Sequence, residues 1–167
     1  FTAPFAFGLM LMAFLLPGTQ LPVPRAVLNP WVEFHAALSL IAYGAFGLAC
    51  VAGIMYLLQE RQLKNHKAST LLYNLPPIND LAVANRRLVW FGFALLTIAI
   101  AAGFLSRGPV NSIKFWAAGL IWCFYAAYLI LGRLHTFTPR RLAEISVLLF
   151  ILALLTLPAM QYLTARP

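Results

Sequence analysis

Long apolar runs separated by short basic segments are the feature that most limits how this chain can fold. The runs lie near residues 2–17, 34–58, 88–105, 113–131 and 142–160. A membrane-spanning helix takes about 17 to 25 mostly apolar residues, and such runs are longer than the strand of a membrane barrel needs. We therefore predict an all-α, polytopic transmembrane helix bundle with about five membrane-spanning helices, in a single domain over residues 1–167.

Composition supports a membrane environment and argues against a nucleic-acid partner. Hydrophobic residues make up 62% of the chain and charged residues 10%, whereas soluble domains are typically about 45 to 50% apolar. The net charge is +8, and the Lys and Arg residues that produce it lie mostly between the apolar runs instead of along one stripe. This is expected for loops that face an anionic leaflet. Cys50 and Cys123 have no second thiol nearby, so we interpret both as small buried apolar residues.

The basic residues predict which loops face the cytoplasm. Eight of the 12 Lys and Arg residues lie in the segments 59–87 and 132–141, and four lie elsewhere. Lys and Arg accumulate on the cytoplasmic side of short loops, so these two segments are expected inside and 18–33 and 106–112 outside. Within the first of them, "NLPPIND" at 74–80 predicts an ordered turn, because each proline fixes its own φ and restricts the residue before it.

Glu33 and His35 stand at the mouth of the second apolar run, where a polar pair is either an interfacial anchor or a site. Deeper in the helices, Ala45, Ala49 and Gly53 recur every four residues, as do Ala99 and Gly103. Small residues at this spacing let helix backbones approach closely in lipid. We interpret these positions as helix-packing faces.

Aromatic residues crowd the fourth apolar run. Trp122, Tyr125 and Leu129 share one helical face, with Trp116 and Tyr128 close by. The face is either part of a packed core with an interfacial aromatic end or a wall for a flat apolar ligand, and spacing does not choose between them. No nucleophile with a base, carboxylate pair or metal cluster is evident in the sequence, so we expect no enzyme. Glu144, close to Arg140, reads as a charge pair at a helix start.

Four separated motifs resemble one family of membrane proteins. They are "HAALSLIAYGAFGLACVAGIMYLLQERQLK" at 35–64, "LPPINDL" at 75–81, "RLVWFGFALLTIAIAAG" at 87–103 and "WCFYAAYLILGR" at 122–133. In order and spacing they resemble the cytochrome c assembly protein family, which includes CcsA, ResC, CcmC and the HemX-like proteins. Members usually carry helices upstream, so the resemblance implies an N-terminal truncation before Phe1 and a longer family domain.

The resemblance implies a haem site at the outer face. His35 falls on the external histidine that serves as an axial haem ligand in haem-handling members, with Glu33 or Tyr43 as its partner. We expect His35 to face the cavity between the second and fourth helices, with Trp122 and Tyr125 as a wall for the haem. A second external histidine is missing, and Met160 and Tyr162 are the only conceivable substitutes for it. The tryptophan-rich haem motif is also replaced, by "PVNSI" at 109–113.

Two functions remain open at this stage. The first is haem binding or delivery for c-type cytochrome maturation, in the inner membrane of a bacterium, with membrane lipid, other subunits of a maturation or electron-transfer assembly and apocytochrome c as partners. The second is a structural or accessory subunit of a larger membrane complex, which keeps the helix bundle without haem. The missing tryptophan-rich motif places the chain nearer to the HemX-like branch.

Overall fold

The computed structural model describes residues 30–64, 77–105, 112–134 and 137–164, with the backbone alone at 112–115 and 157–164. Four helices occupy these ranges: α2 (Pro30–Lys64), α3 (Ile78–Leu105), α4 (Ser112–Arg133) and α5 (Pro139–Thr164). None of the described residues lies in a strand. The predicted all-α class is therefore confirmed for the described part of the chain.

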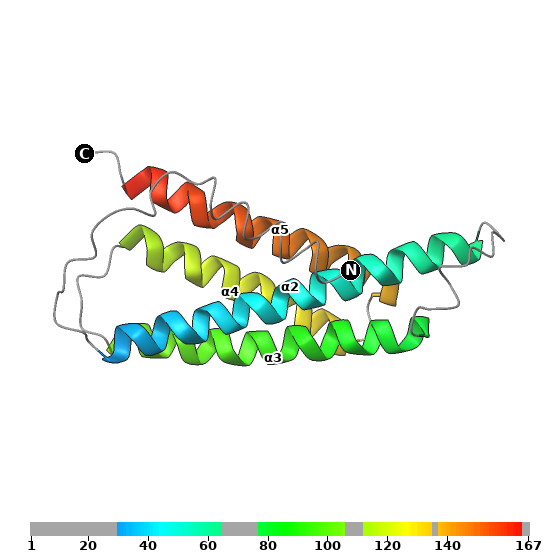
Figure 1. Ribbon diagram of the computed structural model, residues 1–167, viewed down its shortest axis with the longest axis horizontal. Helices are drawn as coiled ribbons and strands as arrows, with labels where there is room; N and C mark the ends of the chain where they lie inside the picture. Colours follow the sequence, from blue (N-terminus) through cyan, green and yellow to red (C-terminus); the bar gives the residue numbers. More distant parts are fainter. Residues whose placement is uncertain (1–29, 65–76, 106–111, 135–136, 165–167) are drawn as a thin grey trace.

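The four helices form an antiparallel bundle. Consecutive helices run in alternate directions; α2 lies beside α3 along its length and also packs against α5, while α4 packs against α5 and α3 (Figure 1). The C-terminal ends of α2 and α4 therefore lie at the same end of the bundle as the starts of α3 and α5. Because Lys64, Arg86, Arg133 and Arg140 belong to this end, we call it the basic end, and we call the other, which holds His35, the histidine end.

Three of the described helices are long and apolar enough to cross a bilayer: α2, α3 and the part of α4 from Trp116 to Arg133. The chain is therefore a multi-pass membrane protein. The predicted span at 142–160 lies in α5, which is not among these three, and the predicted span at 2–17 lies outside the described residues. Five spans consequently stay a prediction.

The helices extend further into the basic end than hydropathy predicts. Arg61 and Lys64 close α2, Arg86 and Arg87 lie within α3, and the segment 59–87 is therefore loop only in part. Long basic side chains reach the wet interface from a helix, so a helix does not have to end where its apolar run ends. The predicted turn at 74–80 is wrong for residues 78–80, because α3 begins at Ile78, directly after Pro77; residues 74–76 lie outside the described residues.

A stacked aromatic pair forms the centre of the bundle. The rings of Phe46 on α2 and Tyr125 on α4 lie 3.9 Å apart between centroids and 14° from parallel. On the opposite side, Phe46 packs against Gly92 of α3, where an added Cβ would come within 2.8 Å of the ring. Gly92 is therefore required as a residue without a side chain, because the ring occupies the space that a Cβ would take.

Candidate functional site

The imidazole of His35 lies against α3 near the histidine end. Its Nδ1 is 2.6 Å from the carbonyl oxygen of Ala99, and a Cβ added at Gly103 would lie 3.2 Å from the same nitrogen. The small residues at positions 99 and 103 therefore leave room for the ring beside the backbone of α3. This confirms that the Ala99 and Gly103 positions form a packing face, and it shows that His35 is what packs there.

This hydrogen bond fixes the tautomer of His35. A carbonyl oxygen only accepts, so Nδ1 must carry the proton and donate to Ala99. In the neutral imidazole the lone pair is then on Nε2, on the side of the ring away from the hydrogen bond. A ring held through one nitrogen with the other free to coordinate is the arrangement that metal-ligating histidines use.

The expected direction of His35 is wrong, because the ring packs on α3 and not in a cavity between α2 and α4. The carbonyl of Ala99 and the open space at Gly103 give the imidazole a partner on α3. Glu33 is exposed in the first turn of α2, and Tyr43 is half-buried against the core two turns deeper. Within the described residues, the hydrogen-bond partner of the ring is the backbone carbonyl of Ala99, and neither Glu33 nor Tyr43.

The aromatic residues of α4 contact two different helices. Tyr125 is 1% exposed, and Phe46 covers the ring face that it turns toward α2. Trp122 packs on Phe93 of α3 with ring centroids 5.3 Å apart, and its Nε1 donates to Thr97 Oγ1 at 3.0 Å. Trp116 is 76% exposed at the end of the helix. The interpretation as a packed core with an aromatic end therefore accounts for the contacts that these side chains make.

For the other residues singled out in the sequence, the structure describes the side chains of the two cysteines but not those of Met160, His66 and His135. Met160 lies in the last turns of α5, where only the backbone is described, so its predicted role as a ligand stays a prediction. Cys50 is buried, as expected, but Cys123 is exposed on α4. The prediction for Cys123 is wrong because a span that is apolar on all sides does not indicate which face meets lipid. His66 and His135 lie outside the described residues.

A buried polar network joins all four helices, and sequence reasoning missed it. Asn85 Nδ2 on α3 donates to the carbonyl of Ala49 on α2 at 2.6 Å and to Ser146 Oγ on α5 at 2.8 Å. The Tyr128 hydroxyl on α4 donates to Asn85 Oδ1 at 2.8 Å, and Ser146 donates to the carbonyl of Ala143. There was little signal for it in the sequence, because Asn85 directly precedes Arg86 and Arg87 and so lies outside the apolar run at 88–105.

Ion pairs connect the ends of α2 and α5 outside this network. Arg140 Nε lies 3.0 Å from Glu144 and 3.6 Å from Glu60, and Glu60 also pairs with Lys64 at 2.9 Å. The hydrogen bond to Glu144, followed by the charge of Glu60, raises the pKa of Arg140 above its ordinary value. The predicted pair at the start of α5 is therefore confirmed for Arg140 and Glu144. Arg133 lies over the ring of Trp90 at 5.0 Å, which connects α4 to α3 at the same end.

Comparison with known proteins adds a family and two partial relatives. The family described as Cytochrome C assembly protein matches residues 1–165. Protein HemX of Brevibacillus brevis is 31% identical over 110 residues, covering 65% of this chain and 40% of that protein. An uncharacterized 28.8 kDa protein in the nifR3-like 5' region of Azospirillum brasilense is 31% identical over 94 residues, covering 54% and 35% of the two chains.

The chain aligns with two fifths or less of the length of these relatives, so what either whole protein does is not transferred with the alignment. No solved structure matches. The family match nevertheless spans nearly all of this sequence, and it covers the four motifs, the three apolar helices and the His35 position alike. The chain belongs to the cytochrome c assembly protein family.

Proposed function

We propose that this chain is the part of a haem-binding or haem-delivery protein that holds the iron through His35, in the maturation of c-type cytochromes. The proposal places it in the inner membrane of a bacterium, beside other membrane subunits and apocytochrome c, without an enzymatic activity of its own. Its support is family membership, together with the similarity to a protein named HemX and the geometry of His35.

One observation carries the proposal: the 2.6 Å contact between His35 Nδ1 and the carbonyl of Ala99. In the neutral ring it keeps the lone pair on Nε2 and holds the ring in one orientation, and among the described residues Nε2 has no hydrogen-bond partner. Haem, when bound, supplies an iron that takes an imidazole as an axial ligand. The donor set therefore fits haem on one side of the iron, and the second side falls to Met160 or to a partner's side chain.

The test is the absorption spectrum of the purified chain, incubated with haem, in three kinds of variant. His35→Ala should lose or shift the haem band. His35→Gln should do the same while keeping an amide that donates to Ala99, which separates iron ligation from packing. His66→Ala and His135→Ala, at the other two histidines of the sequence, are the matched controls and should leave the band unchanged.

A structural or accessory subunit is the second candidate, and the close packing of small residues supports it. Ala45, Ala49 and Gly53 are buried against neighbouring helices, and His35 itself contributes a contact between α2 and α3. In this function His35 holds two helices together and binds no iron. A purified chain without a haem band, whose folded state is weakened by His35→Ala and maintained by His35→Gln, would support this candidate and contradict the first.

A further inference from the structure

A cavity of about 140 Å³ opens at the basic end of the bundle, far from His35 along the helices. All four helices line it: Tyr56 comes from α2, Asn79 and Arg86 from α3, Tyr128 from α4 and Leu142 from α5. A single water needs about 10 to 15 Å³ of such space, so the cavity has room for several waters. A single compact polar group of about five heavy atoms fits the same space.

The back wall of the cavity is fixed by the buried polar network. Both amide hydrogens of Asn85 are donated, to Ala49 and Ser146, and the hydroxyl hydrogen of Tyr128 is donated to Asn85. These two wall residues have no donor left for a ligand. The donors that remain at the cavity belong to Arg86, Asn79 and Tyr56.

The cavity has a positive electrostatic character. No carboxylate is among its lining residues, and within the described residues Arg86 forms no ion pair. Of the carboxylates at this end, Glu60 and Glu144 are both engaged by Arg140, and Asp80 in the first turn of α3 is not among the lining residues. Asn79 and Pro139 place the first turns of α3 and α5 at the cavity, and the start of a helix adds partial positive charge.

We propose that this cavity binds a phosphate group, supplied by the headgroup of an anionic phospholipid. Arg86 offers a guanidinium whose fork matches phosphate oxygens, and Asn79 and Tyr56 add neutral donors. Ala82, Val83 and Leu142 line the rest of the cavity, which suits a phosphate carried on an apolar molecule better than a free, fully hydrated ion. Basic pockets between membrane helices are where anionic headgroups bind.

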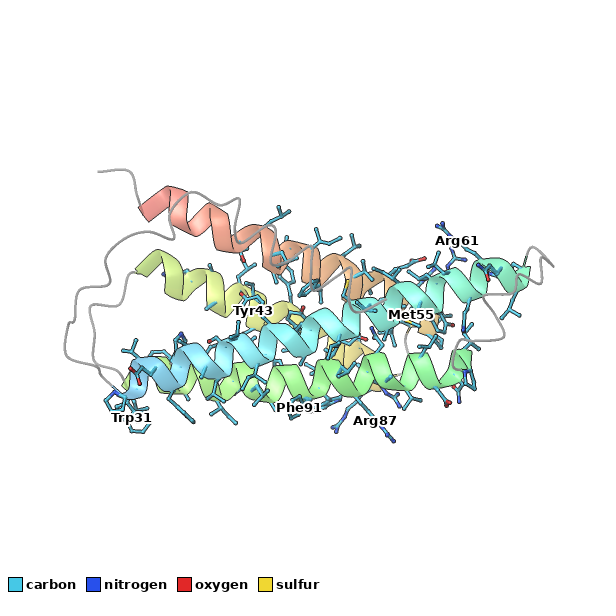
Figure 2. All side chains as sticks on the ribbon, in the orientation of Figure 1. Trp31, Tyr43, Met55, Arg61, Arg87 and Phe91 are labelled. Carbon is cyan, nitrogen blue, oxygen red and sulfur yellow. The ribbon has the colours of Figure 1, made fainter. Side chains whose placement is uncertain are left out.

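The experiment compares Arg86 with its neighbour Arg87. Both are exposed arginines of α3, but Arg87 does not line the cavity and projects away from the bundle (Figure 2). The purified whole chain in detergent is titrated with phosphatidylglycerol, phosphatidylcholine or inorganic phosphate, and bound ligand is measured by native mass spectrometry. Arg86→Gln should weaken phosphatidylglycerol binding about tenfold, as expected for a charge-assisted hydrogen bond, and Arg87→Gln should change it less than twofold.

A second variant tests the cavity without changing the charge. Ala82→Leu fills the space beside Arg86 and should also weaken phosphatidylglycerol binding about tenfold, as the loss of Arg86 does. Equal losses in Arg86→Gln and Arg87→Gln would show a general attraction to the basic end and overturn the site. Inorganic phosphate that binds as tightly as the lipid, with the same dependence on Arg86, would keep the phosphate site and overturn the lipid as its source.

Discussion

Gly92→Ala should destabilise the bundle although alanine is the better helix former. The added Cβ would lie 2.8 and 2.9 Å from two carbons of the Phe46 ring, whereas carbon atoms in contact sit about 3.5 to 4.0 Å apart. The ring would have to retreat by about 0.7 Å or more. Behind it lies Tyr125, already at a centroid distance of 3.9 Å, so the ring has no room and the helices must move apart.

The magnitude follows from two opposing contributions. Overpacking a filled core costs about 1 to 3 kcal/mol, and the blocked retreat of the Phe46 ring places this site in the upper half of that range. The exchange of glycine for alanine within a helix returns up to about 1 kcal/mol. The net loss in the free energy of unfolding should therefore be about 1 to 2 kcal/mol, or a factor of about 5 to 30 in the unfolding equilibrium.

The assay is SDS-induced unfolding of the purified chain, followed by circular dichroism. Gly44→Ala and Gly119→Ala are the matched controls, because an added Cβ at either position has no neighbour within 4 Å. Both should be as stable as the parent or slightly more so. Phe46→Leu should cost less in the Gly92→Ala background than alone, because the smaller side chain makes room. Equal stability of Gly92→Ala and the two controls would refute the packing argument.

The remaining predictions concern the network, the ion pairs and the topology. Asn85→Ala should lower the free energy of unfolding by about 1 to 3 kcal/mol, because three hydrogen bonds lose their shared partner. Tyr128→Phe removes one of these hydrogen bonds and should lower it by about 0.6 kcal/mol. Both changes are measured by titration with SDS. Glu60→Gln should change stability by less than about 1 kcal/mol, because its ion pairs lie at the surface. Cysteines placed at Asn74 and Gly108, in a chain without its own cysteines, should be labelled from outside intact cells at Gly108 only; labelling at Asn74 alone would reverse the topology.

Hydropathy predicts where the helices lie, because a segment in lipid must form all its backbone hydrogen bonds internally and an apolar run is therefore helical. The apolar runs at 34–58, 88–105 and 113–131 all fall within α2, α3 and α4. The ends are harder to predict, because arginine and lysine are compatible with both the last turns of a helix and a loop. Prolines stand at two of the starts, with Pro77 directly before α3 and Pro139 first in α5, since a proline can begin a helix or precede one.

Which face of a membrane helix meets its neighbours could not be predicted from composition. Cys50 and Cys123 look alike in the sequence, yet one is buried and the other exposed. In lipid both faces of a span are apolar, so the period that identifies the buried face of a soluble helix is weak. The spacing of small residues was the exception, because it marks close contact: Ala45, Ala49 and Gly53 are buried, and His35 packs at Ala99 and Gly103.

The sequence identified His35 as the candidate residue, but it did not predict which group His35 contacts. His35 stands out as the one histidine at the mouth of an apolar run, but its partner, a backbone carbonyl of α3, has no signature in the sequence. The same holds for Asn85, whose three partners come from α2, α4 and α5. Partners that are distant along the chain are determined by how the helices cross, and an isolated residue type does not encode that.

The two ends of the bundle therefore differ in chemistry while the middle is closed. At the histidine end, the imidazole of His35 is held on α3 through Nδ1, and an imidazole nitrogen suits a borderline metal centre. At the basic end, Arg86 and two neutral donors surround a cavity without carboxylates, which suits an anion. Between them, the stack of Phe46 on Tyr125 against Gly92 and the network around Asn85 fill the described core. These contacts separate the two candidate sites along the bundle, so variants at one end test that end without altering the residues of the other.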